Sequence, residues 1–327
     1  MPARATPLLI DVDTGIDDAF ALLYACASSR ARLVGVSTVA GNVDLASATR
    51  NTRAVLALAR RGEVPVWPGC AAPLLRAQND ARLFHGAGGL GHAELPEPAA
   101  RPAATHAIDA ILAAVSAESG ALTLVATGPL TNVAAALLRE PALPRQLGRL
   151  VLMGGAYREG GNVTPAAEFN IWHDPEAARI VFRAFAADDA APLVAVGLDV
   201  TRRAQLRPAD LETLARRCSG LPHASPLLRF LDDSSRHYFE TMERLTGARV
   251  FTMHDPLAVA AAIDPSLIVT QRVAVDVETA GALTSGMTVA DWRGVWARPP
   301  NADVAVEVEA PRFIADFIDG MERLARG

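Results

Sequence analysis

The segment Leu8-Leu-Ile-Asp-Val-Asp-Thr-Gly-Ile-Asp-Asp-Ala19 places four aspartates between an apolar run and a helical pattern. Leu8 to Ile10 predict a buried strand, Thr14 and Gly15 predict a turn, and the apolar stretch from Ala19 to Ala27 predicts a helix. The four carboxylates therefore gather where a strand ends and a helix begins. In an open α/β sheet, ligands bind at that edge.

Four like charges at this edge indicate a metal site. Close carboxylates repel one another and raise each other's pKa unless a positive charge lies among them. The chain contains no lysine, and no arginine lies between Asp11 and Asp18. An oxygen-rich site of this kind suits a hard divalent cation, calcium or magnesium. The alternative is that Asp17 and Asp18 only begin a helix, where the macrodipole favours acids. It leaves Asp11 and Asp13, on an apolar strand, unexplained.

The composition is that of a globular chain with a large core. Half of its 327 residues are hydrophobic and 20% are charged. The net charge of -5 gives no basic surface for nucleic acid, and no stretch has the length of a membrane span. Cys26, Cys70 and Cys218 show neither disulfide nor metal spacing. Because the first strand follows the amino terminus directly, we expect no secretory signal and a cytoplasmic protein.

Short apolar runs alternate with helical patterns along most of the chain. This alternation predicts an α/β fold with an open, mainly parallel (mixed), twisted sheet, flanked by helices and Rossmann-like. We expect residues 1–327 to form a single domain, with the strand-free helical segment 206–247 as a small cap over the site. The predicted strands are Leu8 to Asp11, Leu33 to Val39, Leu122 to Ala126, Leu150 to Met153, Leu193 to Val196 and, as an antiparallel edge, Ile268 to Val277 and Val304 to Val308. The predicted helices begin near Asp17, Leu45, His106, Leu130 and Pro175.

Three later clusters also lie at the ends of predicted elements. Thr127-Gly-Pro-Leu-Thr-Asn132 and Met153-Gly-Gly-Ala156 follow strands, and turn chemistry alone explains both. His254-Asp255-Pro256 precedes an apolar helix. Asp255 is there either a plain N-cap with proline at N1 or the distant acid that completes the shell of the cation. In the second case His254 lies beside it as a proton donor.

A polar trio, Asn162, Glu168 and Asn170, surrounds Phe169. Neutral amides and one acid suit several sugar hydroxyls, because each hydroxyl donates and accepts hydrogen bonds. A capping box at the start of a helix explains the same residues. Both interpretations remain open at this point.

Taken in order, these segments resemble the inosine–uridine nucleoside hydrolase family, from Leu8 to about Val289. The resemblance implies an open α/β fold, a tightly held Ca²⁺ and hydrolysis of the N-glycosidic bond of ribonucleosides to ribose and a free base. It also implies that the substrate is a small nucleoside and that the protein forms a homodimer or homotetramer. Neither nucleic acid nor a membrane is an expected partner. The matching segments are Asp11 to Ala19, Val39-Ala-Gly-Asn42, Ala126 to Asn132, Met153-Gly-Gly155, Asn162 to Asn170, His254-Asp-Pro256 and Gly286-Met-Thr-Val-Ala-Asp291.

The resemblance implies a role for each matching residue. Ca²⁺ is expected on the carboxylates of Asp13, Asp18 and Asp255 and on the Thr127 carbonyl. Asp13 is also expected to be the general base for a calcium-bound water that Asn42 steadies. The expected substrate-binding residues are Asp17 at the ribose 2′-hydroxyl, Asn162, Glu168 and Asn170 around the ribose, Met153 on its floor, His85 and Phe169 beside the nucleoside, and His254 facing the base.

His254 is expected to deliver a proton to the leaving base, as a histidine near its ordinary pKa of ~6.5 does at neutral pH. The sequence departs from the family in two places. Thr14 stands where many members have proline, which affects only the turn. The stretch 227–247 matches weakly where members place base-contacting tyrosines or histidines, and His237, Tyr238 and Phe239 are the candidates there.

Other functions fit parts of the same sequence. A phosphatase of the haloacid dehalogenase type shares the strand-Asp-x-Asp-Thr pattern, but its chemistry normally uses a lysine, which this chain lacks. A catalytically silent protein that binds calcium and a nucleoside would keep every residue named above. A dinucleotide-binding site has little support, because no Gly-x-Gly-x-x-Gly follows a predicted strand.

Overall fold

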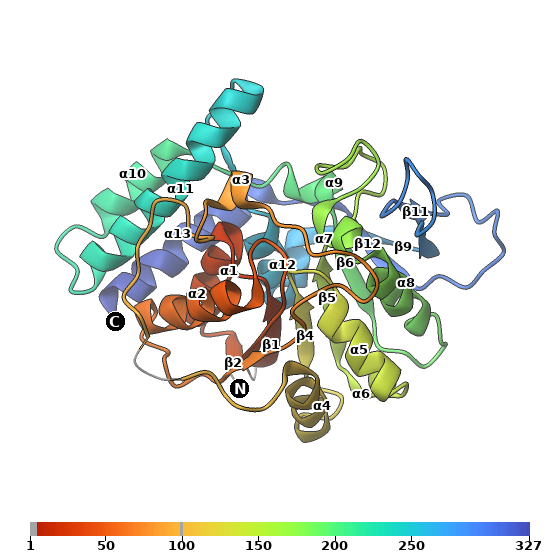
Figure 1. Cartoon of the computed structure of the whole chain (residues 1–327). Coiled ribbons are helices and arrows are strands. Elements are labelled where there is room, and N and C mark those ends of the chain that lie inside the picture. The colour runs from red at the N-terminus through yellow and green to blue at the C-terminus, as the bar shows by residue number, and fades with distance from the viewer. Residues whose placement is uncertain (1–4, 99–100) are drawn as a thin grey trace.

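An eight-stranded sheet forms the centre of the computed structural model, which describes residues 5–98 and 101–327 (Figure 1). Its strand order is β3-β2-β1-β4-β5-β6-β12-β9, and neighbours are parallel except β12 and β9, which are antiparallel. The strands are β1 (Thr6–Val12), β2 (Ala31–Thr38), β3 (Val66–Pro68), β4 (Thr123–Ala126), β5 (Arg149–Met153), β6 (Leu193–Val196), β7 (Gln205–Leu206), β8 (Phe251–Thr252), β9 (Ile268–Val273), β10 (Val275–Val277), β11 (Thr288–Ala290) and β12 (Ala302–Val308). The helices are α1 (Ile16–Ala27), α2 (Leu45–Leu58), α3 (Arg82–His85), α4 (Ala107–Ala117), α5 (Thr131–Arg139), α6 (Leu143–Gln146), α7 (Phe169–His173), α8 (Pro175–Ala184), α9 (Leu198–Thr201), α10 (Pro208–Arg217), α11 (Ala224–Thr246), α12 (His254–Ile263), the 3₁₀ helix η1 (Pro265–Leu267) and α13 (Ala310–Arg326).

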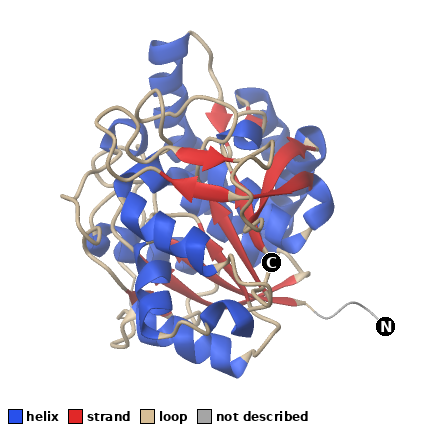
Figure 2. Cartoon of the chain, turned by 90° about the vertical axis from the view of Figure 1, so that its right-hand side faces the viewer, coloured by secondary structure: helices blue, strands red, loops and turns tan. Residues whose placement is uncertain are grey.

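Helices cover both faces of the sheet (Figure 2), because its strands are apolar on both sides. Leu8, Ile10 and Val12 of β1 pack into one core with α1, α11, α12 and α13. Leu9 packs into a second core with α4, α5 and α8. All four side chains are fully buried. A strand buried on both faces has a continuous apolar sequence, which is why β1 was predictable.

The predicted, mainly parallel α/β sheet is confirmed, and most of the predicted strands end within two residues of the observed ones. One strand prediction was wrong. Ile268 to Val277 is divided at Ala274, because β9 pairs with β12 whereas β10 leaves the sheet to pair with β11. The edge strand β3 escaped prediction because it is short and contains a proline. The carboxyl-terminal helix α13 was also not predicted.

The chain changes direction across the sheet between β1 and β4. From β1 it proceeds outward to β2 and β3, and after α4 it returns to β4 and proceeds the opposite way to β5 and β6. The connections that follow β1 and β4 therefore diverge, which leaves a crevice at the carboxyl ends of these two strands. The run from Asp11 to Asp18 spans the end of β1 at this crevice.

The segment predicted as a helical cap, residues 206–247, consists mainly of α10 and α11, and its first residue belongs to β7. Helix α11 projects upward beside the sheet in Figure 1. Among the described residues, no helix is both long enough and apolar enough to cross a membrane. The expectation of no secretory signal rests on the amino terminus, whose residues 1–4 lie outside the described ranges.

Asp264 connects the end of α12 to two distant arginines. Its carboxylate caps η1 by accepting from Ser266 N at 3.2 Å, and it forms ion pairs with Arg30, before β2, and Arg312, in α13. The Asp264 side chain is only 11% exposed, whereas both arginines are about half exposed. These contacts hold α13 against the amino-terminal half of the sheet.

Asp264→Asn is expected to lower the free energy of unfolding by about 1 kcal/mol at neutral pH, because ion pairs with exposed arginines are weak and asparagine still caps η1. The Ser266 hydrogen bonds and the arginines lower the pKa of Asp264. Its charge therefore stabilises the fold above about pH 4, and this contribution is lost as the pH falls through the lowered pKa. Urea unfolding of both proteins between pH 7 and pH 3 measures the effect. A difference that stays constant over this range would contradict it.

Candidate active site

A cavity of about 820 Å³ opens at the carboxyl edge of the sheet. Its lining includes Asn42 after β2, Thr127 after β4, Met153 at the end of β5, and Asp17 and Asp255 from the first turns of α1 and α12. Residues far apart in the sequence therefore meet at the crevice described above. The sequence-predicted site residues that line the cavity are Asp17, Asn42, His85, Thr127, Met153, Asn162, Glu168, Phe169, Asn170, Tyr238, His254 and Asp255.

The acidic cluster forms because α1 and α12 begin next to the end of β1. Asp17, Asp18 and Asp255 each offer a carboxylate oxygen, and these oxygens lie within 4.8 Å of one another. This compact group contains Asp17 in place of Asp13, which the family resemblance put among the metal ligands. Asp13 is fully buried, and the charge of Asp18 nearby acts on it. The two helix N-termini offset part of the negative charge, since each macrodipole is positive there.

Hydrogen bonds fix the acids in place but leave one oxygen of Asp13 and one of Asp17 free. Asp13 Oδ2 accepts from Asn42 N at 2.6 Å. Asp18 accepts from Gly15 N at 2.9 Å and from the Thr127 hydroxyl at 2.8 Å. Asp13 Oδ1 and Asp17 Oδ1 are buried and have no hydrogen-bond partner. Unpartnered buried carboxylate oxygens are costly, so this arrangement suits a cation or a ligand donor.

Burial raises the pKa of every acid in the cluster. The pKa of Asp17 rises to about 8, mainly through desolvation and then through the charge of Asp18. The pKa values of Asp13 and Asp255 rise well above their ordinary value for the same two kinds of reason. Within the described part of the chain, no arginine forms an ion pair with any of these acids. The carboxylates therefore lack a positive counter-charge from the protein.

Asp11 differs from the other acids of the run. It lies on β1, where the Ser37 hydroxyl and the Asn132 amide donate to its Oδ1 at 2.5 and 2.8 Å. Burial raises its pKa to about 6, against the effect of those hydrogen bonds. Like Asp13 and Asp18, it does not itself line the cavity, and its Oδ2 is buried without a hydrogen bond. Asp11 thus joins β1, β2 and α5 behind the site.

His85 lies close to Asp17 but gives it no positive charge. Its Nδ1 is 3.9 Å from Asp17 Oδ1, and the same nitrogen accepts from Ile16 N at 3.0 Å. A ring nitrogen that accepts a hydrogen bond carries no proton. Burial also lowers the pKa of His85 to about 3. The ring is therefore neutral, with its proton on Nε2.

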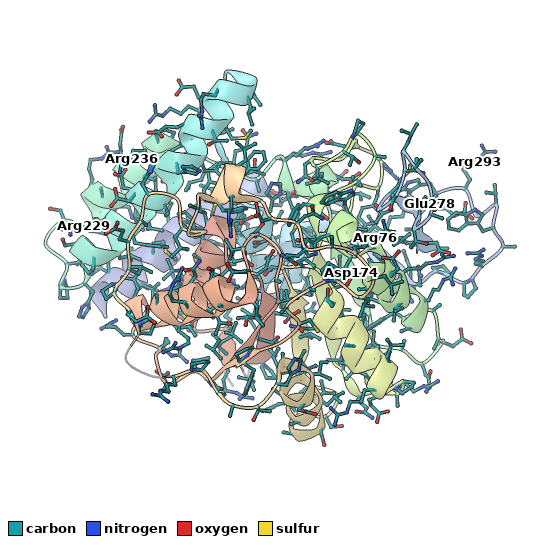
Figure 3. The ribbon with its side chains drawn as sticks, viewed as in Figure 1. Arg76, Asp174, Arg229, Arg236, Glu278 and Arg293 are labelled. Carbon is teal, nitrogen blue, oxygen red and sulfur yellow. The ribbon has the colours of Figure 1, made fainter. Side chains whose placement is uncertain are left out.

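The strap, residues 69–93 between β3 and α4, carries His85 across the edge of the sheet. It is attached to α8 at one point, where Arg76 pairs with Glu176 at 2.6 Å and Leu74 N donates to Asp174 at 2.8 Å. Figure 3 shows Arg76 and Asp174 close together beside α8. Beyond this attachment the strap supplies Asp80, Ala81, Leu83, Phe84 and His85 to the cavity wall.

The polar trio both caps a helix and lines the cavity. Glu168 is the N-cap of α7, where its carboxylate accepts from Gly155 N, Asn170 N and Ile171 N at 2.9–3.1 Å. Asn162 Oδ1 accepts from Phe169 N at 2.9 Å. The Asn170 amide donates to the carbonyls of Thr127 and Met153. Glu168 therefore caps α7 as a plain N-cap, without the reciprocal side-chain bond of a capping box, and all three polar side chains line the cavity.

His254 is half-buried at the start of α12, and its Nδ1 lies 2.8 Å from the Thr201 hydroxyl of α9. Burial, followed by the charge of Arg202, lowers the pKa of His254 to about 4. The expectation that it titrates near 6.5 was wrong, because the sequence does not reveal how deeply this ring is buried. At neutral pH His254 is uncharged and offers a hydrogen bond rather than a mobile proton.

His237 does not line the cavity, although it precedes Tyr238, which does. Its Nε2 lies 3.3 Å from the Leu83 carbonyl, and its ring packs edge-on against His92 with centroids 5.1 Å apart. His237 therefore holds the strap against α11. Because His237 and Tyr238 are consecutive in a helix, their side chains lie on different faces of α11. The weak resemblance of residues 227–247 to the family could not show which of the two reaches the cavity.

Sequence reasoning missed the far wall of the cavity. This wall is formed by the end of α11, the loop after it and the β7–β8 pair. The two strands have two residues each, too few for a pattern to indicate them. Of these residues, Thr252 lies nearest a recognised motif in the sequence, because it stands two residues before His254. The lining residues missed on this wall are Arg202, Gln205, Met242, Leu245, Thr246, Ala248, Val250 and Thr252.

Because burial lowers its pKa to about 4, His254 is expected to keep the chemical shifts of a neutral imidazole down to about pH 5. Histidine-labelled protein followed by NMR between pH 8 and pH 5 measures this, and the signal lost in His254→Gln assigns the resonance. A titration centred near the ordinary histidine value of ~6.5 would show that the ring is open to solvent.

Comparison with known proteins agrees with the site. The family model described as inosine-uridine preferring nucleoside hydrolase matches residues 8–315. The pyrimidine-specific ribonucleoside hydrolase RihA of Enterobacter sp. (strain 638) is 39% identical over 322 residues, 98% of each chain. The inosine-uridine preferring nucleoside hydrolase of Leishmania major is 40% identical over 321 residues, 97% of this chain and 98% of that one.

Solved structures give the same result. A purine-preferring ribonucleoside hydrolase from Gardnerella vaginalis superposes with a TM-score of 0.90 at 33% identity, over 98% of this chain and 99% of that one. A plant nucleoside hydrolase superposes with a TM-score of 0.88, also at 33% identity, over 97% and 99%. The phosphatase and dinucleotide-binding alternatives are thereby set aside. The chain belongs to the inosine-uridine preferring nucleoside hydrolase family and is an enzyme that hydrolyses the N-glycosidic bond of ribonucleosides.

Proposed function

We propose that this ribonucleoside hydrolase depends on Ca²⁺ and uses Asp13 as its general base. The observation that supports this most directly is the group of buried carboxylates, which no cationic side chain of the described residues balances. Oxygen-only donor sets suit hard cations, and calcium accepts the mixture of carboxylate and carbonyl ligands present here. The proposed ligands are Asp13, Asp18, Asp255 and the Thr127 carbonyl.

The unpartnered oxygens support the fit of a cation. Asp13 Oδ1 is buried without a hydrogen bond, and Asp255 has a strongly raised pKa. The Thr127 carbonyl accepts from the Asn170 amide at 2.7 Å and retains a second lone pair. Bound Ca²⁺ would supply the missing positive charge, lower the pKa of a water and hold sugar hydroxyls.

Asp13 is the acid best prepared to receive a proton from the attacking water. The Asn42 N–H holds its Oδ2, while its Oδ1 has no partner among the described residues. A carboxylate that acts as general base is well oriented when one of its oxygens accepts a fixed hydrogen bond and the other can still accept a proton. Asn42, whose own amide also donates to Asp18 at 3.2 Å, would keep that water in place.

The ribose would lie between the acids and the polar trio. Asp17 Oδ1 is free to accept from the 2′-hydroxyl, and Asn162, Glu168 and Asn170 line the same cavity with Met153 beneath them. Breaking the glycosidic bond creates positive charge on the sugar. The surrounding carboxylates stabilise that charge in the transition state more than in the ground state.

His254 would assist departure of the base as a neutral hydrogen-bond donor. When the Thr201 hydroxyl donates to Nδ1, the remaining ring proton is on Nε2, where it can bind the base. His85, Phe169 and Tyr238 would flank the nucleoside. The relatives named above carry both pyrimidine and purine preferences, so base preference depends on residues outside the shared motifs.

The purified protein is expected to contain one Ca²⁺ per chain. Removing it with a chelator should abolish uridine and inosine hydrolysis and lower the melting temperature, because the acids lose their counter-charge; added Ca²⁺ should restore both. A ligand present at 100 times its Kd stabilises a fold by about 2.7 kcal/mol. Metal analysis, calorimetry and a reducing-sugar assay measure these effects. Full activity after chelation, or zinc as the bound metal, would overturn the proposal.

Asp13→Asn is expected to leave the fold intact and reduce kcat at least ~10²- to 10⁴-fold, because an amide cannot take the proton of the water. Its oxygen still accepts from Asn42 N, so the local backbone stays in place. Asp11→Asn is the matched control, since it alters a fully buried aspartate two residues earlier whose Oδ1 is held by Ser37 and Asn132. Near-normal turnover by Asp13→Asn, or equal losses in both variants, would remove Asp13 from the mechanism.

A further inference from the structure

The far wall of the cavity carries a polar pair next to the proposed leaving-group donor. Gln205 of β7 lies opposite Thr252 of β8 in the antiparallel register, and both residues line the cavity. Thr252 lies two residues before His254. Cross-strand neighbours are close enough to act on the same ligand. The rest of this wall is largely apolar, with Met242, Leu245 and Val250 on it.

The amide of Gln205 has a defined orientation. Its Nε2 donates to the Arg202 carbonyl at 3.0 Å. A backbone carbonyl cannot donate, so the amide must turn its NH₂ toward Arg202 and its Oε1 away. No hydrogen bond reaches Gln205 Oε1 within residues 5–98 and 101–327. Gln205, which lines the cavity, therefore has an amide oxygen that no donor among these residues occupies.

The anchor of this amide is itself fixed. Arg202 is the C-cap of α9, and its guanidinium binds Glu159 at 2.9 Å and the Gly161 carbonyl at 2.8 Å. The preceding residue, Thr201, binds His254. The end of α9 thus sets the position of Gln205 and of His254 together. A rigid support of this kind lowers the entropy lost when a ligand binds.

Neighbouring polar groups on this wall are already engaged. The Thr252 hydroxyl interacts with the Tyr238 hydroxyl and counteracts the effect of burial on the pKa of Tyr238. The Thr246 hydroxyl donates to the Met242 carbonyl at 2.8 Å. Gln205 Oε1 accepts from no protein donor among the described residues and is therefore available to a base whose sugar lies at the acidic end of the cavity.

We infer that Gln205 determines base specificity by accepting a hydrogen bond from an N–H of the base, either a ring imide N–H or an exocyclic amino group. The inference rests on the proposed binding of the ribose beside the acids. It predicts that bases with such a donor react faster than analogues whose nitrogen is methylated, because a site arranged for a hydrogen bond disfavours a partner that cannot make it.

The test compares kcat/KM for uridine and 3-methyluridine, and for inosine and 1-methylinosine, in the parent enzyme and in Gln205→Leu. p-Nitrophenyl riboside is the internal reference, because it has the sugar but no base N–H. For whichever of uridine and inosine the parent hydrolyses better, Gln205→Leu should lower kcat/KM by about 3- to 10-fold. It should remain within about twofold on the methylated analogue and on p-nitrophenyl riboside. The parent's preference for N–H over N–CH₃ should shrink accordingly.

Gln146→Leu serves as the matched control, since Gln146 is also a partly exposed glutamine but lies in α6, away from the cavity. It should change none of the rates. Equal losses of Gln205→Leu on uridine and p-nitrophenyl riboside would mean that Gln205 only supports β7, which overturns the inference. Failure of the parent enzyme on every substrate would instead contradict the proposed function, so the two failures are distinguishable.

Discussion

Desolvation of clustered carboxylates is the constraint on which the rest of this structure depends. The fold takes four acids out of water where β1 ends, and burial is the largest cause of the raised pKa at Asp13, Asp17, Asp18 and Asp255. Two helices begin at this point and direct the positive ends of their dipoles toward the acids, which offsets only part of the cost. The remaining desolvation cost would be offset by a bound cation, which is why this cluster of buried carboxylates suits a cation site.

The sheet topology makes that cluster possible. Because the chain leaves β1 in one direction and β4 in the other, the connections that follow these strands diverge and leave space above their carboxyl ends. Asp18 can then accept from Thr127, which follows β4, while Asp13 accepts from Asn42, which follows β2. α12, which packs against α1, brings Asp255 from the distant part of the chain. The acids are thus held by three strand ends at once.

The sequence predicted the strands and acids well because both depend on local patterns. β1 is an apolar run, and the Asp11 to Asp18 segment needs no tertiary information to be noticed. Gln205 and Thr252 were missed because their strands have two residues each and exist only through mutual pairing. The ring of His254 was assigned an ordinary pKa because its burial arises from α9 and α12 together. His237 and Tyr238 are adjacent in sequence, and only the packing of α11 separates their roles.

Burial acts on the acids and the histidines in opposite directions, and this combination suits glycosidic cleavage. It raises the pKa of the carboxylates but lowers the pKa of His85 to about 3 and of His254 to about 4. The histidines therefore add no positive charge that would compete with a metal ion or with the sugar cation of the transition state. They contribute neutral N–H groups instead, so neither histidine opposes the stabilisation of positive charge on the sugar by the carboxylates. At the base end of the cavity the wall is largely apolar, and the neutral groups of Gln205 and His254 would bind the base through hydrogen bonds.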